Sequence, residues 1–325
     1  MESKQPLVSI ALIAYQNAPF LVESIEGILA QTYPNIEVII SDDGSTDGSG
    51  EIIEKYTAMY TQIRYLSSTV NRGVAENMNI SFKHCVGEYL CVIAADDAMY
   101  PDKIKKQVEF LANNPDYDLC FHNVDVYDED TGLVQYQWLD KFKPTRFPTD
   151  ALFRANWFFK RNNRKTPSGS WFGRSSYLKQ SINDKRTSIY HEFLYTLGMY
   201  AAKPHGKWHT LTEVLGKYRV HSRSMSNTKS NWTGHAEDIS TCYTLAAVKF
   251  PQYIRQIQKE EAYWWFSQLL YNQVPDGSYG KYRNLFIRKY GFLRYIYLVA
   301  CKILLGSVFA PVRKTVKGLK RLFFK

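Results

Sequence analysis

Short runs of consecutive apolar residues alternate, through residues 7–127, with segments whose apolar residues recur every three or four positions. Consecutive apolar residues indicate buried strands, and the 3.6-residue period indicates amphipathic helices. The runs predict strands at 7–14, 36–40, 63–66, 89–93 and 119–127. The periodic segments predict helices at 19–29, 47–59, 74–85 and 101–113, the second capped by Ser45 or Asp47. This alternation predicts an α/β, Rossmann-like fold with a mostly parallel sheet flanked by helices and right-handed crossovers.

The pattern changes after residue 127. Residues 128–187 mix polar and aromatic residues without a clear period, which predicts an irregular segment. A helix is expected at 190–202, a strand at 213–220, and helical structure from Thr233 to the end. We therefore expect a main domain, a helical C-terminal extension and a basic tail, at 1–228, 229–290 and 291–325.

Charge is unevenly distributed along the chain. The chain has a net charge of +10, but 12 of its 41 Lys and Arg residues and no acid lie in 281–325. The first 280 residues therefore hold 29 basic against 31 acidic residues. A protein that binds nucleic acid over a broad surface is basic throughout its domain. No nucleic-acid partner is expected.

The five cysteines include no Cys-x-x-Cys pair, and most lie in apolar runs. Such cysteines are typical of small core residues in a reducing compartment. The first apolar run is short, and the positively charged region and the cleavage site of a signal peptide are lacking, so no signal peptide is expected. These features predict a location in the cytoplasm or on the cytoplasmic face of a membrane.

Polar residues follow several predicted strands, at the edge where open α/β sheets bind nucleotides. Ala14 and Tyr15 end the first strand, and an aromatic ring there can stack on a base. Asp43 follows the second strand and can accept the imide N–H of a uracil, or it can serve only as a helix cap. Arg72 follows the third strand; its planar guanidinium can contact a base or a diphosphate, although an exposed loop arginine is the commoner case.

Asp96 and Asp97 come directly after the predicted strand at 89–93. Adjacent carboxylates beside a core strand are costly unless they bind a cation or face solvent. Mg²⁺ or Mn²⁺ held there can neutralise a leaving diphosphate. A solvated turn before the helix at 101–113 is the alternative.

Six short motifs follow one another within residues 6–225. They are Val8–Tyr15, Ile28–Tyr33, Ser41–Asp47, Asn71–Ala75, Gly87–Leu90 and Ala95–Asp97, the last followed by Pro101. As an ordered set they resemble the family 2 glycosyltransferases of the GT-A fold. The resemblance implies an inverting transfer of a sugar from a nucleotide-activated donor, commonly a UDP-sugar.

The resemblance assigns roles to particular residues. It implies that Ala14, Tyr15, Asp43, Arg72 and Asp96 contact the donor nucleotide. It further implies that Asp97 is a ligand of Mn²⁺ or Mg²⁺. Many relatives carry another aspartate where this chain has Ala94, so the complete ligand set of the metal stays open.

The catalytic base of the family is an acid at the start of a helix. Tyr190–Leu194 matches this segment, with Glu192 at the base position and His191 before it. A carboxylate there can take the proton of an acceptor hydroxyl during attack on the anomeric carbon. His191 is a rival base, and an ordinary helix N-terminal acid is the alternative for Glu192.

Tyr218–Ser226 resembles the family's loop over the donor. His221 there can complete the metal shell or hold the diphosphate, with Arg223 nearby. The Gln-x-x-Arg-Trp motif of processive synthases is missing, so addition of a single sugar is expected.

Residues 292–325 combine an apolar stretch with an amphipathic basic segment. Such a segment binds an anionic membrane surface, each base contributing about 1 kcal/mol near the surface. Charges at 294 and 302 disfavour a full span, and packing on the main domain is the alternative. We expect a peripheral enzyme that acts on a lipid-linked glycan acceptor. The expected pathway is the biosynthesis of a bacterial surface polysaccharide, lipopolysaccharide or capsule.

Three other functions can be weighed against the pattern. A nucleotidyltransferase requires a Gly-rich loop with a basic residue after the first strand, where this chain has Ala14–Asn17. A nicotinamide oxidoreductase requires a G-x-G-x-x-G motif at the same place, and this chain lacks it there. A non-catalytic, membrane-bound sugar-nucleotide-binding protein has no need of acids at 96, 97 and 192.

Overall fold

The computed structural model describes residues 5–141, 168–181, 183–187, 191–203, 206–224, 232–255, 257–258, 261–262, 265 and 279–291. The chain divides into two compact units, Met1–Asn227 and Thr228–Lys325.

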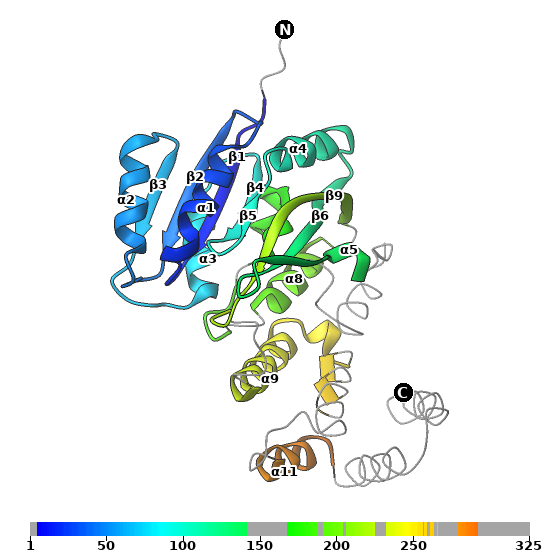
Figure 1. The fold of residues 1–325 in the computed structure, drawn as a ribbon. Helices are drawn as coiled ribbons and strands as arrows, with labels where there is room; N and C mark the ends of the chain where they lie inside the picture. The colour runs from blue at the N-terminus through cyan, green and yellow to red at the C-terminus, as the bar shows by residue number, and fades with distance from the viewer. Residues whose placement is uncertain are drawn as a thin grey trace. The chain divides into compact units, whose positions relative to one another are not determined.

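A mixed sheet forms the centre of the first unit (Figure 1). Its parallel strands are β1 (Val8–Ala14), β2 (Ile36–Asp42), β3 (Ile63–Ser67), β4 (Tyr89–Ala94), β6 (Tyr117–Asp128) and β9 (Lys207–Val220). The antiparallel strands are β5 (Ala98–Met99), β7 (Leu133–Gln137) and β8 (Phe172–Arg174). Among the described residues the strand order is β3-β2-β1-β4-β8-β6-β9-β5, with β7 paired to β6. β8 runs opposite to both of its neighbours, which gives β6 and β9 the same direction as β1 and β4.

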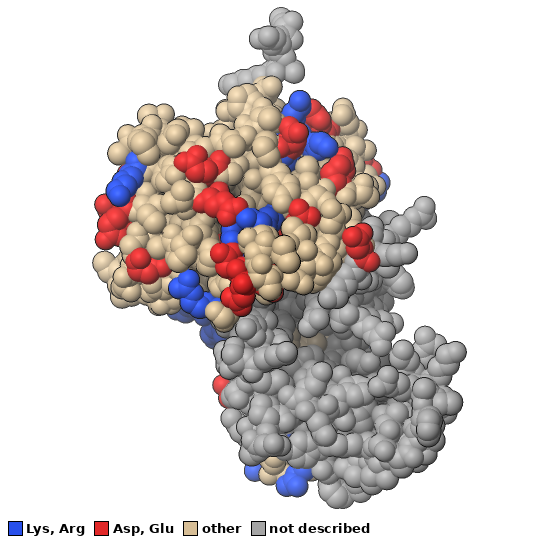
Figure 2. All heavy atoms as spheres, in the orientation of Figure 1, with Lys and Arg blue, Asp and Glu red and all other residues tan. Residues whose placement is uncertain are grey.

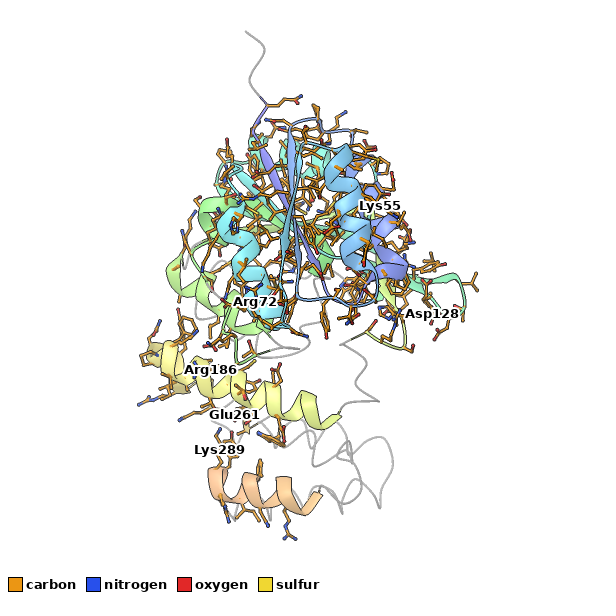
Figure 3. The ribbon with its side chains drawn as sticks, turned by 90° about the vertical axis from the view of Figure 1, so that its left-hand side faces the viewer. Lys55, Arg72, Asp128, Arg186, Glu261 and Lys289 are labelled. Atoms are coloured by element: carbon orange, nitrogen blue, oxygen red, sulfur yellow. The ribbon has the colours of Figure 1, made fainter. Side chains whose placement is uncertain are left out.

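Helices cover both faces of the sheet, as Figure 3 shows from the side. On one face lie α1 (Ala18–Leu29), α2 (Ser49–Met59) and α4 (Lys103–Asn113). On the other lie α3 (Val74–His84), α7 (Ser175–Leu178) and α8 (His191–Ala202).

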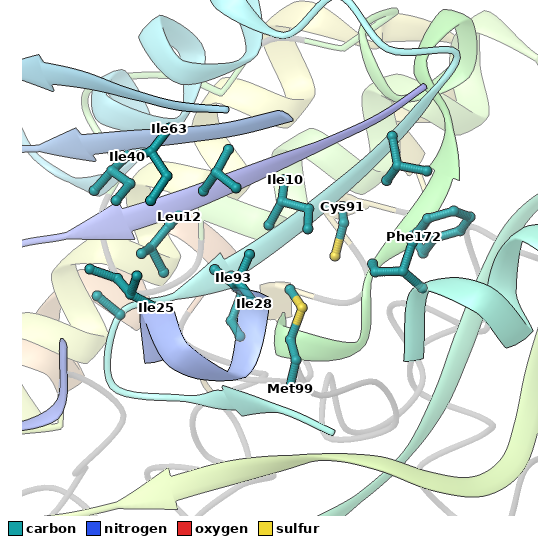
Figure 4. Close-up of a cluster of buried hydrophobic side chains, with 14 of the residues drawn as sticks. Ile10, Leu12, Ile25, Ile28, Ile40, Ile63, Cys91, Ile93, Met99 and Phe172 are labelled. Carbon is teal, nitrogen blue, oxygen red and sulfur yellow. The ribbon is translucent and has the colours of Figure 1, made fainter. Parts of the chain in front are cut away.

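Alternation along β1 explains the two layers. Ile10 and Leu12 point into the core under α1, where Ile25 and Ile28 meet them (Figure 4). Ala11, between them in sequence, belongs to the core on the α3 face. Most positions of the central strands are apolar because both faces of the sheet are buried, which is why these strands read as nearly continuous hydrophobic runs.

The expected fold class is present, and three local expectations were wrong. The segment predicted to be irregular contains β7, α5 (Trp138–Lys141), a 3₁₀ turn at Ser168–Ser170, β8 and α7. These elements have five residues or fewer, too few for a period to appear.

β9 begins at Lys207, six residues before the predicted start, and pairs with β6 through several register shifts. These irregularities break the alternation that a sequence pattern needs. The cap of α2 is Gly48, with φ 95°, rather than Ser45 or Asp47. Asp47 lies one residue before this cap and accepts hydrogen bonds from the amide and the hydroxyl of Ser49, the first residue of α2.

The second unit is helical where it is described. It contains α9 (Trp232–Lys249), a 3₁₀ turn at Pro251–Tyr253 and α11 (Tyr279–Tyr290). The buried Glu261 forms an ion pair with Lys289 of α11, 2.5 Å apart (Figure 3). The predicted membrane-associating tail, 292–325, lies outside the described residues. Within the described part of the chain, no helix is both long enough and apolar enough to cross a bilayer.

Figure 2 shows acidic and basic side chains interspersed over one face of the described residues.

Candidate active site

The carboxyl ends of β2, β1 and β4 meet at one edge of the sheet. Ala14 is in register with Asp42, and the Asp43 amide donates to the Ala14 carbonyl at 3.0 Å. On the other side of β1, the Ala95 amide donates to the Ile13 carbonyl at 2.9 Å. The backbone therefore brings Ala14, Asp43 and the Asp96–Asp97 turn to the same edge.

Tyr15 stands exposed at this edge on a fixed loop. Its side chain is 45% exposed. The next residue, Gln16, has φ 56°, a left-handed backbone conformation that is unfavourable for residues other than glycine. The Gln16 amide donates to Ser45 Oγ at 2.8 Å, and the Ala18 amide to Asp47 Oδ2 at 3.0 Å. These bonds hold the strained loop and leave the tyrosine ring available for stacking.

Asp43 is buried and organises the loop that carries Arg72. Its Oδ1 accepts the Arg72 amide at 3.0 Å, and its Oδ2 accepts the Gly73 amide at 2.7 Å. Gly73 has φ 88° and immediately precedes α3. Each carboxylate oxygen still has a second lone pair, which can accept from a ligand. Arg72 Nε lies 3.8 Å from Asp43 Oδ1, and Figure 3 shows Arg72 at the end of the sheet where these loops gather.

Asp97 is a buried carboxylate with few donors. Its Oδ1 accepts the Arg219 amide at 2.9 Å. Burial, and next the charge of Asp96, raise the pKa of Asp97 well above its ordinary value. Gly169, in the turn before β8, lies against it, since a Cβ built there would be 3.0 Å from Asp97 Oδ2.

The loop after β9 reaches the same turn. His221 Nε2 lies 3.1 Å from Asp96 Oδ2, while its Nδ1 is buried and has no hydrogen-bond partner among the described residues. The His221 ring packs on Phe20 of α1, with ring centroids 4.8 Å apart. The exposed Arg223 places its guanidinium 5.8 Å from the centre of the same Phe20 ring.

The residues of this turn fit a divalent cation. Within the described residues no three His, Cys, Asp or Glu side chains already converge as a metal cage. However, a cation would favour the charged form of Asp97, which burial and Asp96 oppose. The Nδ1 atom of His221, which has no hydrogen-bond partner among the described residues, is a further potential metal ligand. Asp97 and His221 are thus the residues that would hold the metal.

Glu192 lies in the first turn of α8. Burial raises its pKa to about 7, and no charged group contributes to the shift. α8 ends at Ala202, and Lys203 pairs with Asp118 at the opposite, amino edge of the sheet, 2.7 Å apart. Its 12 residues span ~18 Å, so its first turn points back toward the carboxyl edge.

The predicted site residues therefore form two groups joined through β1, with one separate member. Ala14, Tyr15, Asp43 and Arg72 gather at β1 and β2, and Asp96, Asp97, His221 and Arg223 gather at β4 and β9. No contact among the described residues links Glu192 to either group, so its role as base stays a prediction. The side chain of His191 lies outside the described residues.

Three residues of the site were missed by sequence reasoning. Arg219, Gly169 and Phe20 all contact the Asp96–Asp97 turn or the loop after β9. Arg219 lies two positions before His221 in a motif that was noticed, so its position was a usable signal. Gly169 and Phe20 gave none, because their contacts depend on how β8 and α1 pack.

Comparison with known proteins places this geometry in a family. A family model described as Glycosyl transferase family 2 matches residues 9–180. Glycosyltransferase GlyG of Streptococcus pneumoniae is 35% identical over 126 residues, which is 39% of this chain and 42% of GlyG. The chain thus spans less than half the length of this curated relative.

Solved structures share the fold. S. aureus TarS 1–349 in complex with UDP-GlcNAc has a TM-score of 0.64 at 18% identity, covering 90% of this chain and 83% of that one. The mannosyltransferase PcManGT from Pyrobaculum calidifontis, in complex with GDP-Man and Mn²⁺, has a TM-score of 0.55 at 16% identity. It covers 97% of this chain and 84% of its own. The expected GT-A fold is confirmed.

Proposed function

The chain belongs to glycosyl transferase family 2, and from that membership we propose that it is an inverting glycosyltransferase that moves one sugar from a UDP-sugar to an acceptor hydroxyl. The proposed acceptor is a lipid-linked glycan in the synthesis of a bacterial surface polysaccharide, lipopolysaccharide or capsule. The observation that carries the proposal is the Asp96–Asp97 turn. It places a buried, donor-poor carboxylate at the nucleotide-binding edge of the sheet.

Two solved relatives of the same fold support the choice of donor class. TarS binds UDP-GlcNAc in one structure, and PcManGT binds GDP-Man with Mn²⁺ in another. Uracil presents an imide N–H, which matches the remaining acceptor capacity of Asp43. A UDP-sugar is therefore the proposed donor, with Mn²⁺ or Mg²⁺ as cofactor.

The residues divide the work of binding the donor. Tyr15 stacks on the base, and Asp43 accepts its N–H while holding the loop of Arg72. Asp97 and His221 would hold the cation, with Asp96 beside His221. When bound, the cation neutralises the diphosphate, so that UDP can leave. Arg223, exposed and stacked on Phe20, provides a further positive group for the diphosphate.

Glu192 is the proposed base. It takes the proton from the acceptor hydroxyl as the oxygen attacks the anomeric carbon opposite the diphosphate. A carboxylate with a pKa of about 7 is well matched to this task near neutral pH. Because Glu192 lies in the first turn of α8, the proposed acceptor enters from the α8 side of the sheet edge.

The enzyme and its donor are tested with the full-length protein. We expect UDP-sugars to raise its melting temperature with Mn²⁺ or Mg²⁺ present, and radiolabelled donor to be turned over by wild type but not by Glu192→Gln. Equal stabilisation in a chelator would contradict the metal assignment. Binding of a UDP-sugar without any turnover would leave a binding protein instead of an enzyme.

The membrane association is tested separately. Deleting 292–325 is expected to release the protein from vesicles that contain an anionic lipid, because this segment carries positive charge and no acid. Vesicle binding that is unchanged by the deletion would refute the anchor and leave the donor chemistry untouched.

A further inference from the structure

Arg219 is a buried arginine near the end of β9, only 5% exposed. Its Nε donates to the Asp96 carbonyl at 2.8 Å, and its backbone amide donates to Asp97 Oδ1 at 2.9 Å. Its two terminal nitrogens form ion pairs with Glu23 and Glu129. Arg219 thus donates hydrogen bonds to the proposed metal-binding turn from both its main chain and its side chain.

The same guanidinium connects three parts of the first unit. Glu23 belongs to α1, Glu129 follows β6, and the Asp96 carbonyl follows β4. The guanidinium also lies over two rings, 4.8 Å from the centre of Phe20 and 5.4 Å from that of Tyr127. The two glutamates are partly exposed, whereas the arginine between them is buried.

The loop that follows Arg219 is a compact turn. The Ser224 amide donates to the His221 carbonyl at 3.0 Å, and the His221 amide donates to Ser224 Oγ at 3.1 Å. A turn closed on itself in this way takes its position from the residues at its base. Arg219 is at that base, two residues from His221 and four from Arg223.

We infer that Arg219 is a positioning residue that fixes the Asp96–Asp97 turn and the His221–Ser224 turn relative to each other. It thereby sets the affinity for the divalent cation without touching cation or donor. This inference rests on the proposed function, in which Asp97 and His221 hold the metal. Three separate acceptors in different directions require the planar fork of arginine, which the single ammonium of lysine cannot reproduce.

Arg174 of β8 provides a matched control. It also donates to two backbone carbonyls, with Nε to Tyr117 at 3.0 Å and Nη2 to Leu111 at 2.9 Å. Its guanidinium lies 5.7 Å from the centre of the Tyr89 ring. However, Arg174 is in register with Tyr89, the first residue of β4, and so lies at the opposite edge of the sheet. A purely structural role predicts similar behaviour for the two arginines.

The experiment measures Mn²⁺ binding in the presence of UDP. The Mn²⁺ concentration at half-saturation is read from the UDP-dependent thermal shift, and free Mn²⁺ is followed by electron paramagnetic resonance. Arg219→Met is expected to raise this concentration about 10- to 100-fold, the usual effect of losing a residue that supports metal ligands. Arg219→Lys is expected to give a smaller rise, and Arg174→Met none, although Arg174→Met also lowers the melting temperature.

Glu129→Gln is the second variant, since it weakens the same contact from the protein surface and leaves the arginine buried. It is expected to raise the half-saturation concentration several-fold, and it decides the case should Arg219→Met not fold. If folded Arg219→Met, or Glu129→Gln, has the wild-type Mn²⁺ half-saturation concentration, this inference is overturned while the proposed function stands. Failure of the wild type itself to bind Mn²⁺ with UDP would overturn the proposed function, and this inference with it.

Discussion

Two aspartate pairs lie at the carboxyl edge of the sheet, and their surroundings differ. Asp42 accepts from the hydroxyl and amide of Ser45, and Asp43 accepts two backbone amides. Asp97, in contrast, accepts one backbone amide, and Asp96 faces an imidazole. The first pair accepts hydrogen bonds from several neutral donors of the loops after β2 and β3, whereas among the described residues Asp97 accepts one, from the Arg219 amide of β9.

The difference shows that identical residues after a strand can serve different ends. Hydrogen-bond donors offset the cost of burying a carboxylate, so Asp43 can hold the loop of Arg72 and Gly73 in place. A buried carboxylate without enough donors is costly, and the pKa of Asp97 is raised accordingly. Such a cost is removed by a bound cation, which makes the second pair the better metal site. Glu192, whose pKa burial alone raises, resembles Asp97 in this respect.

The largest effect is expected for Asp97→Asn. Turnover should fall about 1000-fold or more, because a metal contributes several kcal/mol to the stabilisation of a leaving diphosphate. The melting temperature should be unchanged or higher, since the variant no longer buries a poorly solvated charge. Turnover and thermal unfolding are measured on the same preparation.

Asp118→Asn is the control for that variant. Asp118 is equally buried but pairs with Lys203 at the amino edge of the sheet. This variant should lose stability and keep Mn²⁺-dependent UDP binding. Near wild-type turnover in Asp97→Asn would remove the distinction between the two aspartate pairs.

Glu192→Gln extends the comparison to the base, with an expected loss of about 100-fold or more in turnover. In the wild type, turnover should rise as the pH passes through about 7, because the base acts in its deprotonated form. The control is Glu51→Gln, which changes an exposed acid in the first turn of α2. A flat pH profile for wild type across this range would exclude Glu192 as the titrating base.

Although Glu192→Gln should lose turnover, it should gain stability at alkaline pH. The pKa of Glu192 in the folded protein, about 7, lies above its ordinary value of 4.5. The folded state is therefore favoured below pH 4.5, and this advantage is lost as the pH rises through 7. At pH 8 the glutamine variant should be more stable than wild type by about 3 kcal/mol, and at pH 4.5 the gain should nearly vanish. Denaturant titrations at the two pH values measure the difference.

Asp43→Asn tests the pair Asp42 and Asp43, whose carboxylates accept several hydrogen bonds, and it should mainly affect stability. An amide has only one acceptor oxygen for the amides of Arg72 and Gly73, so about 2 kcal/mol of unfolding free energy should be lost. Affinity for UDP should fall about tenfold with the loss of one charge-assisted contact. The Mn²⁺ requirement should not change. A shift in Mn²⁺ half-saturation as large as that of Asp97→Asn would contradict the division of roles.

The smallest effect is expected for Gly169→Ala. The added Cβ would lie 3.0 Å from Asp97 Oδ2, so the carboxylate must move by a few tenths of an ångström. We expect about a threefold rise in Mn²⁺ half-saturation, equivalent to about 0.7 kcal/mol. Gly50→Ala, whose Cβ would meet only the Tyr65 hydroxyl at 3.4 Å, serves as the control.

The sequence predicted β1 to β4, β6 and the four helices between them, because both faces of the sheet are buried and these elements are long enough to show a pattern, whereas the two-residue β5 was missed. Asp43 and the Asp96–Asp97 pair could be predicted as well, since each directly follows such a strand. The resemblance to the family, carried by the same strand ends, is confirmed.

The support of the site could not be predicted in the same way. The contact between Arg219 and Asp97 joins residues 122 positions apart, and the approach of Gly169 depends on the short antiparallel strand β8. A three-residue strand has no period, and a contact across the sheet leaves no local pattern. The sequence therefore gives the groups that meet the ligand more readily than those that hold them.

The late position of β9 has a consequence for biosynthesis. The strands that carry both aspartate pairs leave the ribosome first. The backbone amide that donates to Asp97 belongs to Arg219, which is synthesised 122 residues later. At translation rates of about 5–20 residues per second, that interval lasts roughly 6–25 s. A nascent chain can thus assemble its central strands early while its donor pocket stays incomplete until β9 has been inserted beside β6.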